Sequence, residues 1–491
     1  MPLRLLALPL ALLLAAPAVA QGLPPEASGG ITLEEAIDLA LATSPEVARA
    51  DLAERGRGLA ERGAGTERLP SVNFQAQPSQ SYGLTFDQTA GELTSQRVES
   101  FNAGVSAQIT LYDGGRTRAL VDQARLDRAS AEASGERTRQ TVAADVAERF
   151  LQLLLDRQLV EIQTEQLEAA RQQLDRAERL VAAGARPESD LPAQRATVAE
   201  RVSALAQATA SVARDRVRLL DRIGLGPLAE VEFIGPALAD LEAAGLLGGE
   251  TPEIEALVEA ALAGRLDLRA QSIAVDAAVA GEALARTVSK PNLSAFGQVG
   301  TGYSSLQQRF VDPDSPPIQI PVTLPDGSPI LLGGEPFVFE QPTLETERTP
   351  LFSQLADNRS GSLGLTLSVP LFDRYAARRQ REEARLAADN ARVELEALER
   401  AVATEVGLAA VEISGAEAQL TAAEARVEAA QAAVDAEEAR YDLGATTPYD
   451  LAAARSRLAE ALASRAQSAY TLVFRRALLR LATGDDLSDL L

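Results

Sequence analysis

The sequence lacks the side chains on which most enzyme mechanisms depend. It has no His and no Cys in 491 residues, which removes the commonest general base and metal ligand, thiolate nucleophiles and disulfides. No GxSxG or phosphate-binding glycine motif stands between a strand and a helix. The segment Asp312-Pro313-Asp314 resembles the start of a calcium loop, but the rest of the loop is missing. We therefore expect no catalytic residue, no metal, no cofactor and no enzymatic activity.

The chemistry that remains is carboxylate chemistry. The chain carries 70 acidic and 47 basic residues, a net charge of −23, which excludes the basic face of a nucleic-acid-binding protein. Asp190 and Asp450 each follow a Gly-containing turn and precede a helical pattern, so either could accept amide hydrogen bonds as a helix N-cap. The acidic excess either lines an interior passage or keeps helix faces in water.

The first 20 residues predict a secretory signal peptide. A basic Arg4 precedes an apolar run from Leu5 to Ala16, and Ala18-Val19-Ala20 ends the segment with small residues. The apolar run is too short to cross a bilayer, which needs about 20 residues. We expect an exported protein that contacts a membrane, if at all, through strands.

The rest of the chain is an internal repeat. Leu111-Tyr112-Asp113 recurs as Leu371-Phe372-Asp373, shifted by 260 residues. Gly184 and Asp190 recur at the same shift as Gly444 and Asp450. Upstream, Pro70 matches Pro291 at a smaller shift of 221, so the second copy carries an insertion. That insertion is rich in Pro and Gly, which predicts a long exposed loop.

Both copies predict the same order of elements. In repeat 1, over 31–249, we expect an upper helix at 31–63, strands at about 70–86 and 100–112, a long helix at 113–183, a tip at 184–190, a lower helix at 190–223 and an equatorial segment at 225–249. In repeat 2, over 250–491, we expect an upper helix at 252–289, strands at 291–303 and 361–372 around a loop at 304–360, a long helix at 373–443, a tip at 444–450 and a lower helix at 450–483.

Heptad spacing predicts coiled-coil packing of the long helices. Apolar residues recur every seven positions in the second copy, and matching apolar residues stand 260 positions earlier. The companion positions differ between the copies: Ala409, Ala416 and Ala423 in the second, and Arg149, Asp156 and Gln163 in the first. We therefore expect the second face of the first copy to be wetter. Heptads alone leave an ordinary helical bundle open.

The strand segments predict a membrane β-barrel. From Phe101 to Leu111, and again from Leu363 to Leu371, apolar residues alternate with small or polar ones, as in strands about ten residues long that cross a bilayer. A small soluble sheet is the alternative for one such strand alone. Four strands cannot close a barrel, because the smallest barrels have about eight. Several chains must then share one barrel that continues into their helices.

The chain resembles the TolC family of outer-membrane ducts. The resemblance rests on Ile31-Thr32-Leu33-Glu34-Glu35-Ala36, the two strand-to-helix junctions, the tandem repeat and the two tip turns. It implies an α+β membrane protein, a homotrimer whose twelve-stranded barrel, four strands per chain, joins a periplasmic helical barrel. It further implies a passive exit duct in outer-membrane lipid. Such a duct serves a tripartite efflux pump or type I secretion system with a periplasmic adaptor and an ABC, RND or MFS transporter.

The resemblance also implies a site. In the family the tips close the periplasmic entrance, which places Asp450 in an acidic ring and Tyr441 and Asp190 in a resting-state lock. Thr446 and Ala453 depart from the family pattern, in which an Arg stands at the position of Thr446; Arg186 occupies the equivalent position in the other tip. The turn residues expected to meet adaptor or pump are Gly184, Pro187, Gly444 and Pro448. Tyr441 also continues the apolar stripe, so core packing is an alternative role.

Two other classes of protein compete with the duct. A periplasmic adaptor also has long helical hairpins, but only one per chain, and it lacks doubled strand pairs. An exported enzyme with acidic catalysts conflicts with the missing His and with the repeat.

Overall fold

The computed structural model describes residues 30–87, 92–243, 247–248, 253–311, 318–341 and 345–484. The signal peptide predicted over 1–20 lies outside the described residues. The chain divides into two units. The helical unit comprises Met1–Ala53, Ala131–Ala270 and Glu396–Leu491, and the strand unit comprises Glu54–Ser130 and Gln271–Leu395.

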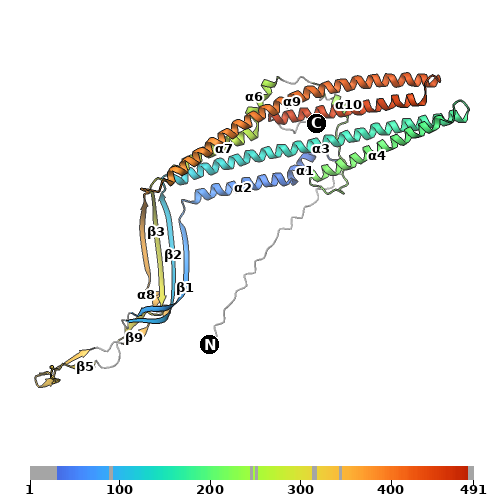
Figure 1. Cartoon of the computed structure of the whole chain (residues 1–491). Helices are drawn as coiled ribbons and strands as arrows, with labels where there is room; N and C mark the ends of the chain where they lie inside the picture. The colour runs from blue at the N-terminus through green and yellow to red at the C-terminus, as the bar shows by residue number, and fades with distance from the viewer. Residues whose placement is uncertain are drawn as a thin grey trace. The chain divides into compact units, whose positions relative to one another are not determined.

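The strand unit is built on one antiparallel sheet of four strands in the order β1-β2-β3-β10. The strands are β1 (Ser71–Asp87), β2 (Glu92–Tyr112), β3 (Asn292–Ser304) and β10 (Ser360–Ser368). Figure 1 shows the labelled strands β1, β2 and β3 side by side. The two strands of each repeat form a hairpin pair, and β2 joins β3 across the repeats. Both edge strands, β1 and β10, have a partner on one side only within the described residues.

The strands differ in length from the prediction. β2 begins eight residues before the expected 100, because β1 pairs with it without interruption from Ser71 opposite Gln108 to Asp87 opposite Glu92. β10 ends at Ser368 rather than 372. Pro370 follows directly, and a proline has no N–H to donate to a strand ladder.

The segment expected as a loop over 304–360 contains regular structure in its described part. It carries three two-stranded ribbons and a short helix. These elements are β4 (Gln308–Val311), β5 (Ile318–Pro321), β6 (Leu331–Leu332), β7 (Glu335–Pro336), β8 (Val338–Gln341), β9 (Glu345–Arg348) and α8 (Leu351–Asp357). Gln354 of α8 is buried and bonds to both backbone groups of Ser304, so α8 is anchored on the end of β3.

The sheet presents large apolar side chains to its surroundings. Phe74 on β1 is 72% exposed, and Leu363 on β10 is 88% exposed. Val72, Leu365 and Leu367 share this exposure. Such a surface in water would be costly, so it marks a face that meets lipid or another chain.

The helices form two long hairpins and two broken upper segments. The hairpins are α3 (Arg116–Ala182) with α4 (Asp190–Arg222), and α9 (Ala376–Asp442) with α10 (Pro448–Thr483). The upper segments are α1 (Leu33–Thr43) with α2 (Pro45–Thr66), and α6 (Ile254–Gly264) with α7 (Leu266–Ala285); α5 (Leu238–Ala243) lies in the segment after α4. The unit boundaries fall inside α2, α3, α7 and α9.

Each upper segment is two helices, where one was expected. Ser44 takes an extended conformation before Pro45, because a proline disfavours the helical conformation in the residue before it. Arg265 is likewise extended between α6 and α7. The predictions of single helices over 31–63 and 252–289 were therefore wrong at these breaks.

The heptad stripe forms the core of the second hairpin. Val406, Ile413, Leu420, Val434 and Tyr441 on α9 are buried, as are Leu451 and Leu458 on α10. The matching stripe of α3 is buried at Val146, Leu153 and Leu167. At the companion positions of the first copy, Arg149 and Gln163 are partly exposed, but Asp156 is only 5% exposed, so the expectation of a wetter face fails at Asp156. Neighbouring helices cover this carboxylate although it replaces an alanine of the second copy.

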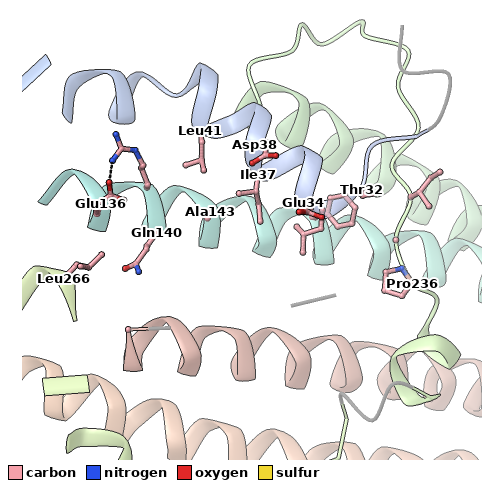
Figure 2. Close-up of a pocket in the computed structure, with 16 residues that line it drawn as sticks. Thr32, Glu34, Ile37, Asp38, Leu41, Glu136, Gln140, Ala143, Pro236 and Leu266 are labelled. Atoms are coloured by element: carbon pink, nitrogen blue, oxygen red, sulfur yellow. Dashed lines mark hydrogen bonds and ion pairs between the residues drawn. The ribbon is translucent and has the colours of Figure 1, made fainter. Parts of the chain in front are cut away.

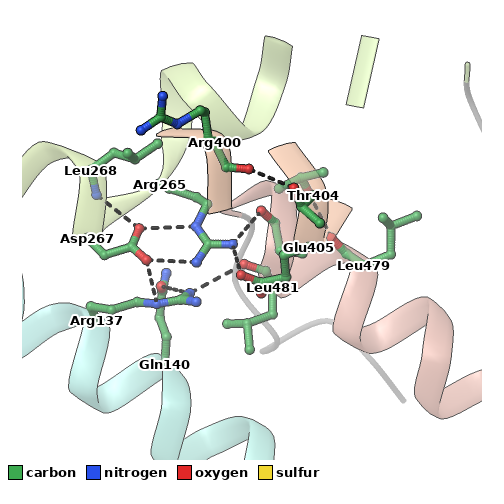
Figure 3. Close-up of polar contacts among 12 residues, drawn as sticks. Arg137, Gln140, Arg265, Asp267, Leu268, Arg400, Thr404, Glu405, Leu479 and Leu481 are labelled. Carbon is green, nitrogen blue, oxygen red and sulfur yellow. Dashed lines mark hydrogen bonds and ion pairs between the residues drawn. The ribbon is translucent and has the colours of Figure 1, made fainter. Parts of the chain in front are cut away.

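An ion cluster around the buried Arg265 fastens the C-terminal end of α10 within the helical unit (Figure 3). The Arg265 side chain is 3% exposed and pairs with Asp267 at 2.7 Å and Glu405 at 2.9 Å. Arg265 and Arg137 also donate to the backbone carbonyls of Ala482 and Leu481, each at 3.4 Å. Burial alone would raise the pKa of Asp267, but its contacts with Arg265 lower it below the ordinary value. The cluster therefore joins α3, α7 and α9 through paired charges, and α10 through hydrogen bonds to its last carbonyls.

No helix in the described part of the chain combines the length and apolar composition needed to cross a membrane.

Candidate functional site at the hairpin tips

The two hairpin tips begin with the same backbone turn. Gly184 and Gly444 have φ of 68° and 72°, a left-handed conformation that glycine adopts without strain. In each tip the residue after the glycine donates its N–H to a carbonyl five residues back, and the glycine donates to the next carbonyl along. This pair of bonds closes the C-terminal end of α3 and of α9 as a Schellman motif. The repeat therefore places equivalent residues at equivalent positions in both tips.

Arg186 of the first tip reaches across to the end of α9. Its guanidinium carbon lies 4.4 Å from the centre of the Tyr441 ring, and its Nη2 donates to the Tyr441 carbonyl at 3.0 Å. Its Nη1 lies 3.7 Å from Asp190 Oδ2, with both side chains less than one-fifth exposed. A guanidinium stacked on an aromatic ring and paired with a carboxylate is a favourable arrangement. Three residues chosen from the sequence thus form one cluster that joins the two tips.

The Tyr441 ring is packed in the core of its hairpin and also contacts the first tip. The side chain is only 3% exposed, as expected for a residue of the apolar stripe. The same ring supplies the face on which Arg186 lies, and the backbone carbonyl receives the arginine proton. Core packing therefore fixes the ring in place for the contact between tips.

Asp450 does not join this cluster. It is exposed and stands at the third position of α10, where its carboxylate accepts from the Thr447 backbone N–H and hydroxyl and from the Thr446 hydroxyl. Its own N–H donates to the Thr447 hydroxyl, which completes a capping box. These hydrogen bonds, above all the one from the Thr447 side chain, lower the pKa of Asp450.

The N-cap role considered for the two acids belongs to other residues. Thr447 is the N-cap of α10, and Ser189 holds that position in α4 without a side-chain bond. Asp190 is the first residue of its helix. The two matched acids therefore differ: Asp190 is paired with Arg186 of the same tip, whereas Asp450 is exposed and accepts hydrogen bonds from Thr446 and Thr447.

The outer surface of the tips is exposed. Gly184, Pro187 and Gly444 are open to solvent, and Pro448 is the first residue of α10. Sequence reasoning missed Leu443 and Tyr449, which are 84% and 74% exposed at the second tip. A usable signal was that both lie off the heptad stripe that runs through Tyr441.

The helical unit also contains a pocket away from the tips (Figure 2). Its volume is about 680 Å³, and it is walled by the start of α1, part of α3 and residues around Pro236. Arg139 in its wall already pairs with Glu136 and Asp51, each at 2.6 Å. Glu34 and Asp38 add negative charge. Among the residues that the structure describes, no three carboxylates converge in a group that could hold a metal ion.

Comparisons with known proteins agree with this architecture. A family model described as "Outer membrane efflux protein" matches residues 36–225 and 257–485. The pyoverdine export outer membrane protein OpmQ of Pseudomonas putida is 27% identical over 286 residues, which cover 57% of this chain and 59% of that protein. The chain thus spans about three-fifths of the length of this relative.

Solved structures show the same fold. The structure of CusC has a TM-score of 0.69 at 17% identity and covers 92% of both chains. The outer membrane protein VceC of Vibrio cholerae has a TM-score of 0.66 at 18% identity, covering 92% of this chain and 96% of that one. The α+β fold expected from the sequence, with strands and long helices in each of two repeats, is confirmed.

Proposed function

Because this chain belongs to the outer membrane efflux protein family, we propose that it is the outer-membrane exit duct of a tripartite efflux pump. The family is one of channels rather than enzymes, and its members lie in the outer membrane and extend into the periplasm. In our proposal the duct transports passively, and energy comes from its partners. The observation that carries this is the four-stranded sheet, whose open edges and exposed apolar residues require further copies of the chain.

The proposed assembly is a homotrimer with a twelve-stranded barrel. An open strand edge in lipid leaves backbone groups without hydrogen-bond partners, which costs several kcal/mol per group. One chain supplies four strands, about half of the smallest known barrels. Three copies give twelve strands and close the sheet, with β1 of one copy beside β10 of the next.

The proposed gate is the cluster of Arg186, Tyr441 and Asp190. Its contacts join the tip of the first hairpin to that of the second within one chain. Opening the entrance moves these tips apart and breaks the contacts. In our proposal Arg186 of the first tip supplies the arginine of the lock, since the second tip has Thr446 where the family has an arginine.

The proposed partners are a periplasmic adaptor and an inner-membrane transporter. The exposed Leu443 and Tyr449 offer apolar contacts at the tip, beside the turn residues Gly184, Pro187, Gly444 and Pro448. A type I secretion system would use the same surface. The alternative, that the chain is itself an adaptor, is disfavoured by two strand pairs in one sheet.

Single-channel recording in planar bilayers tests the duct and the lock together. We expect trimers resistant to SDS, and low conductance in the resting state. Arg186→Ala removes every contact of the cluster and should raise the open probability about tenfold or more. Arg195→Ala is the control, because Arg195 is exposed on α4 and its one ion pair within the described structure is with Glu178 on the neighbouring helix. A soluble monomer without detergent would refute the duct; unchanged gating of a conducting Arg186→Ala trimer would refute the lock alone.

The proposed acidic ring of three Asp450 carboxylates needs a test that separates charge from capping. Asp450→Asn removes the charge, whereas Thr447→Ala removes the cap and keeps the carboxylate. Converging carboxylates attract cations and slow their passage. We expect Asp450→Asn to weaken block by multivalent cations at least tenfold, and Thr447→Ala to leave block within twofold. Equal block in wild type and Asp450→Asn would rule the ring out.

A further inference from the structure

A small cavity lies between the two hairpins, a few helical turns from the tips. Its volume is about 20 Å³, enough for one particle the size of a water molecule. Its walls come from α3, α4 and α10, through residues that include Gln173, Gln194, Arg201 and Arg455. The cavity therefore touches both hairpins of the helical unit.

The walls carry hydrogen-bond donors that lack acceptors. Gln173 is 7% exposed, and its buried Nε2 has no hydrogen-bond partner within the described structure. Arg201 is 8% exposed, and no described residue accepts a hydrogen bond from it or forms an ion pair with it. Arg455 differs, because Glu438 and the Ala169 carbonyl occupy its donors. A buried donor without an acceptor costs about 1–3 kcal/mol, and an unpaired buried charge costs more.

The cavity is also positively charged within an acidic protein. The chain contains 70 acidic residues, yet the described residues that line the cavity include two arginines and no carboxylate. The charge of Arg455 is balanced by Glu438. The charge of Arg201 is left without a counter-ion in the described structure. The missing element is therefore both an acceptor and a negative charge.

The second repeat shows that the hairpin does not need these polar residues to fold. At the shift of 260 residues, Gln173, Gln194 and Arg201 correspond to Ala433, Ala454 and Ala461. Ala454 and Ala461 are buried in an apolar cluster of α9 and α10. Small apolar residues thus fill the equivalent positions where no cavity ligand is required.

We propose that this cavity binds one monatomic anion, chloride in the periplasm, held by the Arg201 guanidinium and the Gln173 amide. A water molecule would accept the orphaned protons but would leave the charge of Arg201 uncompensated. Carboxylate and phosphate ions exceed the available volume. The bound halide ties α3 to α4 close to the tips, against the wall that α10 supplies.

Crystals of the full-length trimer grown in sodium bromide test the occupant directly. We expect an anomalous bromide peak in the cavity of each protomer, in contact with Arg201 and Gln173. A peak that is absent, with ordinary water density in its place, would overturn the proposal. A carboxylate of a neighbouring protomer in the cavity would overturn it as well.

The midpoint of heat dissociation of the trimer, compared in chloride and gluconate at equal ionic strength, tests the energetic role. We expect the wild type to dissociate several degrees higher in chloride, and Arg201→Gln to show no such difference. Gln173→Glu places a carboxylate in the cavity, so we expect this variant to keep the trimer and to lose the chloride response as well. It tests the chloride site even if Arg201→Gln does not assemble. Arg195→Gln, an exposed arginine of the same helix, should respond like wild type. A chloride response retained in Arg201→Gln or Gln173→Glu would contradict the site.

Discussion

The two hairpins have matched sequences and tip geometry but different interiors. The hairpin of α9 and α10 is filled by alanines and branched apolar residues, including Ala416, Ala454 and Ala461. In the hairpin of α3 and α4 the matched positions hold Asp156, Gln194 and Arg201, and these polar residues are equally buried. The second repeat shows what the fold requires. The first repeat shows where polar groups have been added that packing does not require.

A pair of matched positions on the facing helices also differs between the two hairpins. In the second hairpin Glu412 on α9 pairs with Arg475 on α10 at 2.7 Å. The corresponding residues of the first hairpin are Gln152 and Asp215, which cannot form that ion pair. Gln152 donates instead to Asp156 at 3.0 Å. The matched positions thus hold an ion pair between helices in one copy, and in the other a buried carboxylate, Asp156, near the partly buried Asp215.

The strongest test of this comparison moves the buried arginine into the second hairpin. Ala461 is fully buried, within an apolar cluster. Ala461→Arg should lower stability by at least about 3 kcal/mol, because it overpacks the cluster and buries a charge without a partner. We expect loss of SDS-resistant trimers at temperatures where the wild type keeps them.

The reverse exchange is the matched control. In chloride-free buffer, Arg201→Ala should cost roughly 1 kcal/mol or less, because it removes a buried charge for which the described residues provide no ion-pair partner. If the two exchanges have equal effects on the heat-dissociation midpoint, the hairpin interiors do not differ as described.

Much of the fold could be predicted from periodicity. The long helices, the strand pairs and the Gly184 and Gly444 turns follow from heptads, alternation and the repeat. The breaks in the upper helices were missed at Ser44 and Arg265, although Pro45 was a visible signal. The ribbons within 304–360 were missed because turn-rich composition masks strands that are only two to four residues long.

The residues of the candidate site could be predicted from the sequence, but the contacts between them could not. The pairing of Arg186 with the Tyr441 ring and carbonyl depends on how two hairpins meet, and no local pattern records that. Likewise, Asp156 has the sequence signature of a wet helix face. Only the packing of other helices over that face reveals that it is buried.

The buried Asp156 predicts a pH dependence confined to the first hairpin. Burial, reinforced by the neighbouring Asp215, raises the pKa of Asp156 from its ordinary 3.8 to about 6, although a hydrogen bond from Gln152 opposes the shift. A raised pKa means that the folded state holds the proton more tightly than the unfolded state. The resulting stabilisation is complete below pH 4 and is lost as the pH rises through about 6.

Asp156→Asn should therefore stabilise the trimer at pH 7.5 by about 1–3 kcal/mol and have little effect at pH 4.5. The difference in heat-dissociation midpoint between variant and wild type, followed across this range, measures it. Glu168→Gln, an exposed change on the same helix, should give a difference that is independent of pH. A flat difference for Asp156→Asn would show that the carboxyl is ionised in both states.

The smallest expected effect concerns the turns that lead from strand to long helix. Asp113 and Asp373 each accept the N–H of a residue four positions on, at 2.6 and 2.7 Å, and so cap α3 and α9. The two residues after Asp113 are glycines with positive φ. The matched residues of the second copy, Arg374 and Tyr375, also have positive φ, of 55° and 64°. A side chain in this conformation costs about 1–2 kcal/mol.

Arg374→Gly should relieve that strain and stabilise the protein by about 0.5–1 kcal/mol, less than the strain itself because glycine also gains freedom in the unfolded chain. Gly115→Ala makes the opposite kind of change at the next position of the first turn, which matches Tyr375: an added Cβ meets nothing within 4 Å, so its cost is conformational alone. We expect the heat-dissociation midpoint to rise in the first variant and fall by a similar amount in the second. If Arg374→Gly is destabilising, the arginine side chain makes a contact in the assembled trimer that outweighs its backbone strain. The second repeat would then also carry a residue selected for something other than the fold of one chain.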